Sequence, residues 1–295
     1  MKLQDGYTLM HEHITIDLSA VKKDPDARLD CFTQTVEELK KLKKAGVSNI
    51  LDVTNIGMGR HPFYVKKAAK ESEINILQST GFYKEPFLPE IVYSKTEKEL
   101  AEIMLKEINE SIDENESNPK AYCIGEIGTS KDEMTAVEKK VFQAAIIAAK
   151  NSTVPIYTHT TLGTYAYEQA VFFIENGIAP ERIIIGHIDL SKDLDYIKKV
   201  LDTGVFVGFD TIGKDNYFSD EDRSDFLIEL EKEGRLNKIV LSLDITRKSH
   251  LEEFGGIGYS HLFTKFLPML RKKGMKEESI DQMLIHNPKT ILEQK

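Results

Sequence analysis

Short apolar runs alternate along the chain with longer segments in which apolar residues recur every three or four positions. The apolar runs predict strands at residues 7–13, 49–55, 74–81, 121–127, 154–160, 182–188, 205–210 and 238–244. Most of these runs are apolar throughout, which is typical of parallel strands that are buried on both faces. Their alternation with helical segments therefore indicates an α/β fold built on a parallel sheet.

Three of the helical segments are preceded by residues that typically cap the N-terminus of a helix. Thr35, Thr96 and Thr135 are each followed three positions later by a glutamate, which is the pattern of a helix capping box. Eight strands with helices between them favour a closed (β/α)8 TIM barrel, with residues 1–295 as a single domain. An open doubly wound sheet is the alternative, but no Gly-x-Gly-x-x-Gly turn follows the first strand.

The composition narrows the range of partners. The chain has 48 acidic and 39 basic side chains, and its formal net charge of −9 comes from residues spread along the sequence. This distribution argues against the clustered basic face that nucleic acids or anionic membranes require. Two cysteines exclude a disulfide scaffold, and no apolar run approaches the roughly 18 residues of a membrane span. We therefore expect a cytoplasmic protein that acts on a small-molecule substrate.

Polar residues stand at the carboxyl ends of five predicted strands, where the active residues of (β/α)8 barrels lie. They are His11 and His13 in the first strand, Glu126 in the fourth, His159 in the fifth, His187 in the sixth and Asp244 in the eighth. Side chains two positions apart on a strand share a face, so His11 and His13 converge on one point. Neutral imidazole is the commonest protein ligand for a divalent metal.

Each of these residues has an ordinary explanation when it is taken alone. A histidine at a strand end is more often a structural residue, Glu126 would serve as an ion-pair partner, and Asp244 as a helix cap. Six such groups at one barrel mouth are harder to explain, because burying any of them without a partner is costly. Together they predict two divalent metal ions bridged by a carboxylate and a solvent hydroxide.

Five short segments of the sequence also resemble those of a known protein family. His-x-His, Gly-Glu-Ile-Gly, Tyr-Thr-His-Thr, Gly-His and Ser-Leu-Asp-Ile-Thr-Arg follow one another in the order found in the phosphotriesterase family of the amidohydrolase superfamily. The resemblance covers nearly the whole chain, and residues 209–214 and 244–250 are most similar to the bacterial phosphotriesterase homology proteins. It implies a (β/α)8 barrel with a binuclear metal site, usually zinc, and a possible homodimer.

The resemblance also implies a role for each candidate ligand. The implied ligands of a buried metal are His11, His13 and Asp244, and those of a more exposed metal are His159 and His187. Catalytic phosphotriesterases and related lactonases bridge their metals with a carboxylated lysine, and Glu126 stands at that position here. A glutamate bridges with its own two oxygens. Its shorter reach is expected to change the metal spacing, which bears on phosphotriesterase activity itself.

Three residues are candidates for catalysis and substrate binding. Asp244 is able to face the hydroxide and is the candidate proton shuttle to the leaving group. Tyr83 lies where related lactonases carry a tyrosine near the exposed metal, and Arg247 suits a carboxylate or phosphate on the substrate. A solvated loop charge is an equally good explanation of Arg247. Lys214 and Asp210, at the seventh strand end, either support the site or contact the substrate.

The leading hypothesis is a metal-dependent hydrolase that cleaves ester-type bonds, with lactones or carboxylic esters as the favoured substrates. Hydrolysis of phosphoesters or phosphotriesters is the alternative among enzymes. A metal-binding barrel without catalysis is a third hypothesis, and the intact set of candidate ligands argues against it.

Overall fold

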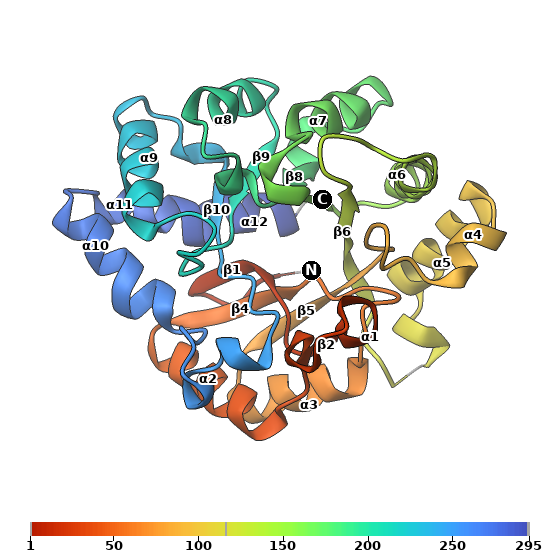
Figure 1. Ribbon diagram of the computed structural model, residues 1–295, viewed down its shortest axis with the longest axis horizontal. Helices are drawn as coiled ribbons and strands as arrows, with labels where there is room; N and C mark the ends of the chain where they lie inside the picture. Colours follow the sequence, from red (N-terminus) through yellow and green to blue (C-terminus); the bar gives the residue numbers. More distant parts are fainter. Residues whose placement is uncertain (1, 116, 294–295) are drawn as a thin grey trace.

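An eight-stranded parallel barrel forms the centre of the protein (Figure 1). The structure is a computed structural model that describes residues 2–115 and 117–293. In spatial order the strands are β1 (Tyr7–Glu12), β4 (Val47–Asp52), β5 (Asn75–Thr80), β6 (Ala121–Thr129), β7 (Ile156–Thr160), β8 (Ile183–Ile185), β9 (Phe206–Phe209) and β10 (Ile239–Leu241). Neighbours pair in parallel, and each strand overlaps one predicted run. The predicted (β/α)8 barrel is confirmed.

Helices connect the strands and surround the barrel (Figure 1). They are α2 (Phe32–Lys44), α3 (Pro62–Ser72), α4 (Glu90–Ser94), α5 (Glu97–Asn109), α6 (Ala136–Lys150), α7 (Ala166–Glu175), α8 (Leu194–Leu201), α9 (Asp220–Lys232), α10 (Leu267–Lys272), α11 (Glu277–Asp281) and α12 (Asn287–Leu292). Residues 16–29 form what we call the strap, in which β2 (Ile16–Asp17), α1 (Ser19–Lys22) and β3 (Arg28–Leu29) follow one another. The hydrophobic pattern does not predict the strap, because its strands have two residues each.

Two of the three predicted helix starts are correct. Thr96 and Thr135 are the N-caps of α5 and α6, and each forms a complete capping box with its glutamate. The prediction at Thr35 is wrong, because α2 begins one turn earlier at Phe32. The carboxylate of Glu38 does not turn back to cap this helix. It accepts hydrogen bonds from two backbone amides of the loop after β10.

The apolar side chains form two layers, one on each side of the barrel wall. The larger layer lies between the strands and the helices. The inner layer takes a buried side chain from each of the eight strands: Met10, Leu51, Leu77, Cys123, Tyr157, Ile184, Phe206 and Val240. Leu3, Ile291 and Leu292 extend this layer at the amino ends of the strands. There the amide of Leu3 donates to the carboxylate of Glu293 over 2.7 Å, so residues 3 and 293 lie side by side.

Candidate metal centre

A register shift in β1 helps to direct the His-x-His motif into the barrel. β1 advances three residues from Leu9 to Glu12 while its neighbour β4 advances two, so β1 contains one extra residue. Such bulges re-aim the side chains that follow and are common next to active sites. The rings of His11 and His13 lie with their centroids 5.5 Å apart, and His11 also packs 4.9 Å from Tyr157 of the inner layer.

A second register shift, in the middle of β6, accompanies the placement of Glu126 at the same point. The two oxygens of this buried carboxylate face different histidines. Oε1 lies 3.3 Å from Nε2 of His13. Oε2 lies 3.0 Å from Nδ1 of His159, 3.6 Å from Nε2 of His187 and 3.7 Å from Nε2 of His11. Glu126 therefore stands between two groups of imidazoles, one from β1 and one from β7 and the end of β8.

Asp244 joins the group that contains His11 and His13. It follows β10 with a φ of 57°, a left-handed conformation that residues other than glycine rarely adopt. Its Oδ1 lies 3.5 Å from Nε2 of His11 and 3.2 Å from Nε2 of His13. Its Oδ2 contacts the ammonium of Lys214. One carboxylate thus faces the histidines with one oxygen and a lysine with the other.

The spacing of these side chains suits divalent cations. Two ligands about 2.1 Å from a tetrahedral ion lie about 3.4 Å apart, and the nitrogen–oxygen separations here run from 3.0 to 3.7 Å. The Nε2 atoms of His11 and His13 are buried without a hydrogen-bond partner among the residues described. Glu126 belongs both to a group with His11 and His13 and to a group with His159 and His187. The residues therefore fit two cations that share one carboxylate.

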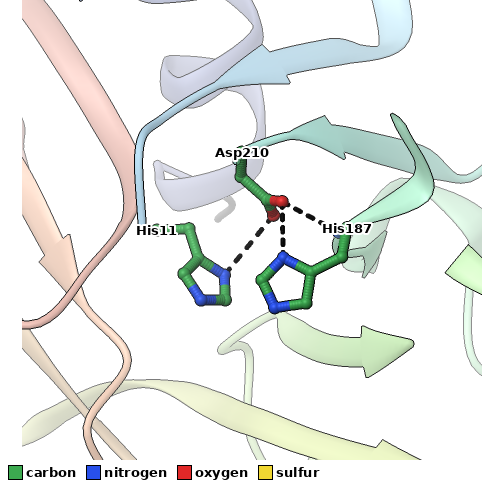
Figure 2. A group of neighbouring side chains, drawn as sticks. All are labelled: His11, His187 and Asp210. Carbon is green, nitrogen blue, oxygen red and sulfur yellow. Dashed lines mark hydrogen bonds and ion pairs between the residues drawn. The ribbon is translucent and has the colours of Figure 1, made fainter. Parts of the chain in front are cut away.

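Asp210, directly after β9, holds two of the histidines from behind (Figure 2). Its Oδ1 accepts the ring Nδ1–H and the backbone N–H of His187, over 2.7 and 2.9 Å. Its Oδ2 accepts the hydroxyl of Tyr157 over 2.7 Å and faces Nδ1 of His11 at 3.4 Å. Because Nδ1 of His187 is occupied in this way, Nε2 is left to face Glu126. The sequence left the role of Asp210 open, and the structure assigns it to support of the site.

Ionisation at the centre couples the carboxylates to the histidines. Burial opposes protonation of His13, but Asp244 and Glu126 raise its pKa to about 10, and Asp210 in the same way holds the pKa of His187 well above its usual value. Burial disfavours ionised Glu126, but His11 and the neighbouring hydrogen bonds hold its pKa well below the usual value. Burial likewise opposes ionised Asp244, and Lys214 outweighs it, so the pKa of Asp244 is also well below its usual value. Burial lowers the pKa of His159 to about 4. At neutral pH the two carboxylates are therefore ionised and His159 is neutral, as metal ligands must be. His13 and His187 hold protons that a cation would displace on binding.

A cavity of about 570 Å³ borders this centre and is lined by Glu126, His159, His187 and Asp244. Both predicted substrate residues also line it. The hydroxyl of Tyr83 lies 3.2 Å from Nδ1 of His159. Arg247 forms ion pairs with Asp24 at 2.6 Å and with Asp26 at 3.4 Å, and so joins the loop after β10 to the strap. Contact of Tyr83 and Arg247 with substrate stays a prediction.

Comparison with known proteins decides the family. The model of the phosphotriesterase family matches residues 2–292. The chain belongs to this family. It is 43% identical to the phosphotriesterase homology protein of Escherichia coli (strain K12) over 283 residues, which are 96% of each chain. A crystal structure of that protein, complexed with phosphate in its active site, has a TM-score of 0.95 at 42% identity and covers 97% of this chain and 98% of its own.

Two further members of the phosphotriesterase family show what kinds of reaction occur among its relatives. The aryldialkylphosphatase of Saccharolobus solfataricus is 31% identical over 96% of this chain and 94% of its own. The phospho-furanose lactonase of Mycoplasmopsis agalactiae is 29% identical over 98% of this chain and 84% of its own. Both names denote hydrolases, so membership of the family supports hydrolysis as the general reaction.

Sequence reasoning missed several residues of this phosphotriesterase-family site. Lys22, Asp24 and Asp26 of the strap contribute to the cavity wall or to the ion pair with Arg247. They lie on a short polar segment with no periodic pattern, which offers no signal before the fold is known. Glu12 was also missed, although a charged residue inside a buried strand is such a signal. Among the described residues, no helix is long and apolar enough to cross a membrane.

Proposed function

We propose that the protein is a zinc-dependent hydrolase with a binuclear site that cleaves lactones or small carboxylic esters. The observation that carries the proposal is Glu126, whose carboxylate belongs to one group with His11 and His13 and to another with His159 and His187, at the edge of a cavity. Imidazole nitrogen and carboxylate oxygen are ligands that suit zinc. Two such ions, when bound, supply water of lowered pKa and polarise a carbonyl oxygen.

Asp244 and Tyr83 are proposed to act directly on the substrate. Lys214 keeps Asp244 ionised, so its carboxylate is able to accept a proton and deliver it to the leaving alkoxide. Burial, with the charge of Glu126 as a second cause, raises the pKa of Tyr83 well above its usual value. Its phenol therefore stays protonated and is able to donate a hydrogen bond to the substrate.

The cavity favours a substrate with an apolar part and an anionic part. Apolar side chains contribute one portion of its lining: Ile16, Leu18, Met58, Phe87 and Leu190. Lys22 and Lys84 also line it, with their ammonium groups 5.8 and 5.9 Å from the centre of the Phe87 ring. Arg247, which is already paired with Asp24 and Asp26, presents a third cation. These charges would pair with a phosphate or carboxylate on the substrate. The phospho-furanose lactonase is a relative whose name combines a lactone with a phosphate.

Metal analysis followed by a hydrolysis screen tests the proposal. We expect about two zinc equivalents per chain and turnover of lactones or esters, with anionic substrates preferred to neutral ones of the same size. Glu126→Gln replaces one of the two shared carboxylate oxygens by an amide nitrogen, which cannot bind a cation, and is expected to lose metal and turnover together. Asp202→Asn, on an exposed residue paired with Arg235, is the matched control and should change neither. Turnover that is unaffected by complete removal of metal would contradict the proposal.

Hydrolysis of phosphoesters or phosphotriesters is the second candidate, favoured by the similarity to the aryldialkylphosphatase. The same purified protein should be assayed with phosphomonoesters, phosphodiesters and a phosphotriester. Turnover of these alone would replace the ester proposal. Two bound metal ions with no turnover of any ester, lactone or phosphoester would indicate a metal-binding barrel without catalysis.

A further inference from the structure

The barrel has one seam at which the backbone ladder is interrupted. Seven neighbouring pairs of strands are joined by parallel ladders, from β1 and β4 round to β9 and β10. Within residues 2–115 and 117–293, no such ladder joins β10 back to β1. This seam lies between the strand of His11 and His13 and the strand that leads to Asp244. Whatever holds it closed also sets the distance between these candidate ligands.

Glu12 bridges this seam with its side chain. Its fully buried carboxylate accepts the hydroxyl of Ser242 over 2.8 Å, the backbone N–H of Leu243 over 2.8 Å and that of Ile245 over 3.1 Å. The hydroxyl oxygen of Ser242 in turn accepts the backbone N–H of His11 over 3.1 Å. The side chains of Glu12 and Ser242 thus form hydrogen bonds across the seam, where backbone hydrogen bonds between the two strands are missing.

The two amides that Glu12 binds are those on either side of Asp244. Asp244 has a left-handed backbone, with φ of 57°, that a non-glycine residue keeps only when its surroundings hold it. A single carboxylate that fixes the amides of Leu243 and Ile245 limits rotation of the backbone between them. The side chain of Asp244 is thereby held toward Nε2 of His11 and of His13.

We propose that Glu12 is a positioning residue that sets Asp244 against His11 and His13 and so determines how tightly the buried metal binds. The middle residue of the His-x-His motif is then a working part of the site and more than a spacer between two ligands. This inference rests on the proposed function, because it assumes that these three side chains hold a metal ion.

Glu12→Gln tests the inference, with Glu38→Gln as its matched control. A glutamine keeps the size of the side chain but replaces one acceptor oxygen by a donor, which cannot accept a backbone N–H. Glu38 is also buried and also accepts two backbone amides, those of Glu252 and Tyr259, over 2.8 and 2.9 Å. Both variants lose the same type of bond, but only Glu12 binds the amides beside Asp244.

Zinc affinity, measured by competition with a chelator, and amide hydrogen exchange at Leu243 and Ile245 are the measurements. Loss of a residue that orients metal ligands typically lowers affinity by about 10- to 100-fold. We expect at least a tenfold loss at one of the two zinc sites in Glu12→Gln, with faster exchange at both amides. Glu38→Gln should stay within about twofold of the wild type in affinity.

Two outcomes would overturn the inference and are distinguishable. If wild type and Glu12→Gln bind zinc equally well, Glu12 only closes the barrel and the proposed function survives. If the wild type binds no zinc at all, the proposed function fails and this inference fails with it. Should Glu12→Gln not fold, Ser242→Ala removes one of the three bonds to Glu12 and is expected to give a smaller loss of affinity in the same direction.

Discussion

Two carboxylates at the candidate centre each contact a different partner with each oxygen. A substitution at either residue is therefore expected to affect both of its contacts. Asp244 faces two histidines with one oxygen and Lys214 with the other. Asp210 serves His187 with one oxygen and Tyr157 with the other. An amide in place of either carboxylate keeps the shape of the side chain and loses one of its two acceptor oxygens.

Asp244→Asn is expected to lower turnover by about 100-fold or more, because a carboxamide cannot accept and deliver the proton. Much of the bound metal should remain, since the carboxamide oxygen is able to face His11 and His13 as Oδ1 does. Steady-state kinetics and metal analysis on the same preparation check this. Full activity in a metal-replete Asp244→Asn variant would rule out the proton-shuttle role.

Asp210→Asn is expected to weaken zinc binding by about 10- to 100-fold, because His187 is no longer fixed with Nε2 toward Glu126. Glu107→Gln is a suitable comparison, since Glu107 is also a buried carboxylate that accepts hydrogen bonds with both oxygens, from Arg60 over 2.7 and 2.9 Å, outside the centre. Chelator competition should show a change in the first variant alone. Equal affinities in the two variants would mean that Asp210 does not orient His187.

The meeting of the six candidate ligands at one point was predictable, and the contribution of the strap to the cavity beside them was not. Histidines and carboxylates at the ends of buried strands stand out because apolar residues are expected there. Lys22 carries no such signal, because a lysine in a short helix is ordinarily solvated. Its place in the cavity wall depends on how the strap folds back, which is a property of the tertiary structure.

The positions of the strands were predictable from the sequence, but the register shifts within β1 and β6 were not. The extra residues in β1 and β6 accompany the inward placement of His11 and Glu126. A period-two pattern does not reveal a bulge, because the run stays apolar on both sides of it. Helix starts were predictable where a threonine and a glutamate formed a local box, as at Thr96. At Thr35 the glutamate binds a distant loop instead.

A buried arginine fixes two of the loops that carry the site. Arg223 of α9 pairs with Asp189 after β8 at 2.7 Å and with Asp220 at 3.0 Å, and it donates to Thr211 after β9 over 2.9 Å. Its side chain is fully buried, so these partners have no access to water as a replacement. The loops that bear His187 and Lys214 are therefore held together from outside the barrel.

Arg223→Met is expected to lower the free energy of unfolding by about 3–5 kcal/mol, because it leaves buried carboxylates without their counter-charge. Urea denaturation followed by circular dichroism measures this. Arg271→Met breaks the exposed pair with Glu277 and should have little effect. Similar midpoints for both variants would show that the buried network adds no more than a surface pair.

For the whole molecule, metal binding and folding are expected to be linked. The candidate ligands are spread over most of the sequence, from His11 to Asp244, and cations would bind this arrangement only in the folded chain. Zinc at about 1,000 times its dissociation constant should add about 4 kcal/mol to the stability of the protein. Chelation should therefore lower the melting temperature.

Differential scanning calorimetry with zinc and with a chelator measures this effect. Glu126→Gln, which lacks one of the two shared oxygens, should show a smaller difference between the two conditions. An equal shift in wild type and variant would mean that the stabilising zinc binds elsewhere.

The bond between Leu3 and Glu293 has a consequence for the order of elements along the chain. Because residues 3 and 293 meet at the amino side of the strands, a short peptide should be able to join them while a new opening is cut in a loop elsewhere. Such a circular permutant would keep every strand neighbour and every ligand of the centre. The fold would then be specified by which strands are neighbours in the barrel and would not depend on which strand is first in the sequence.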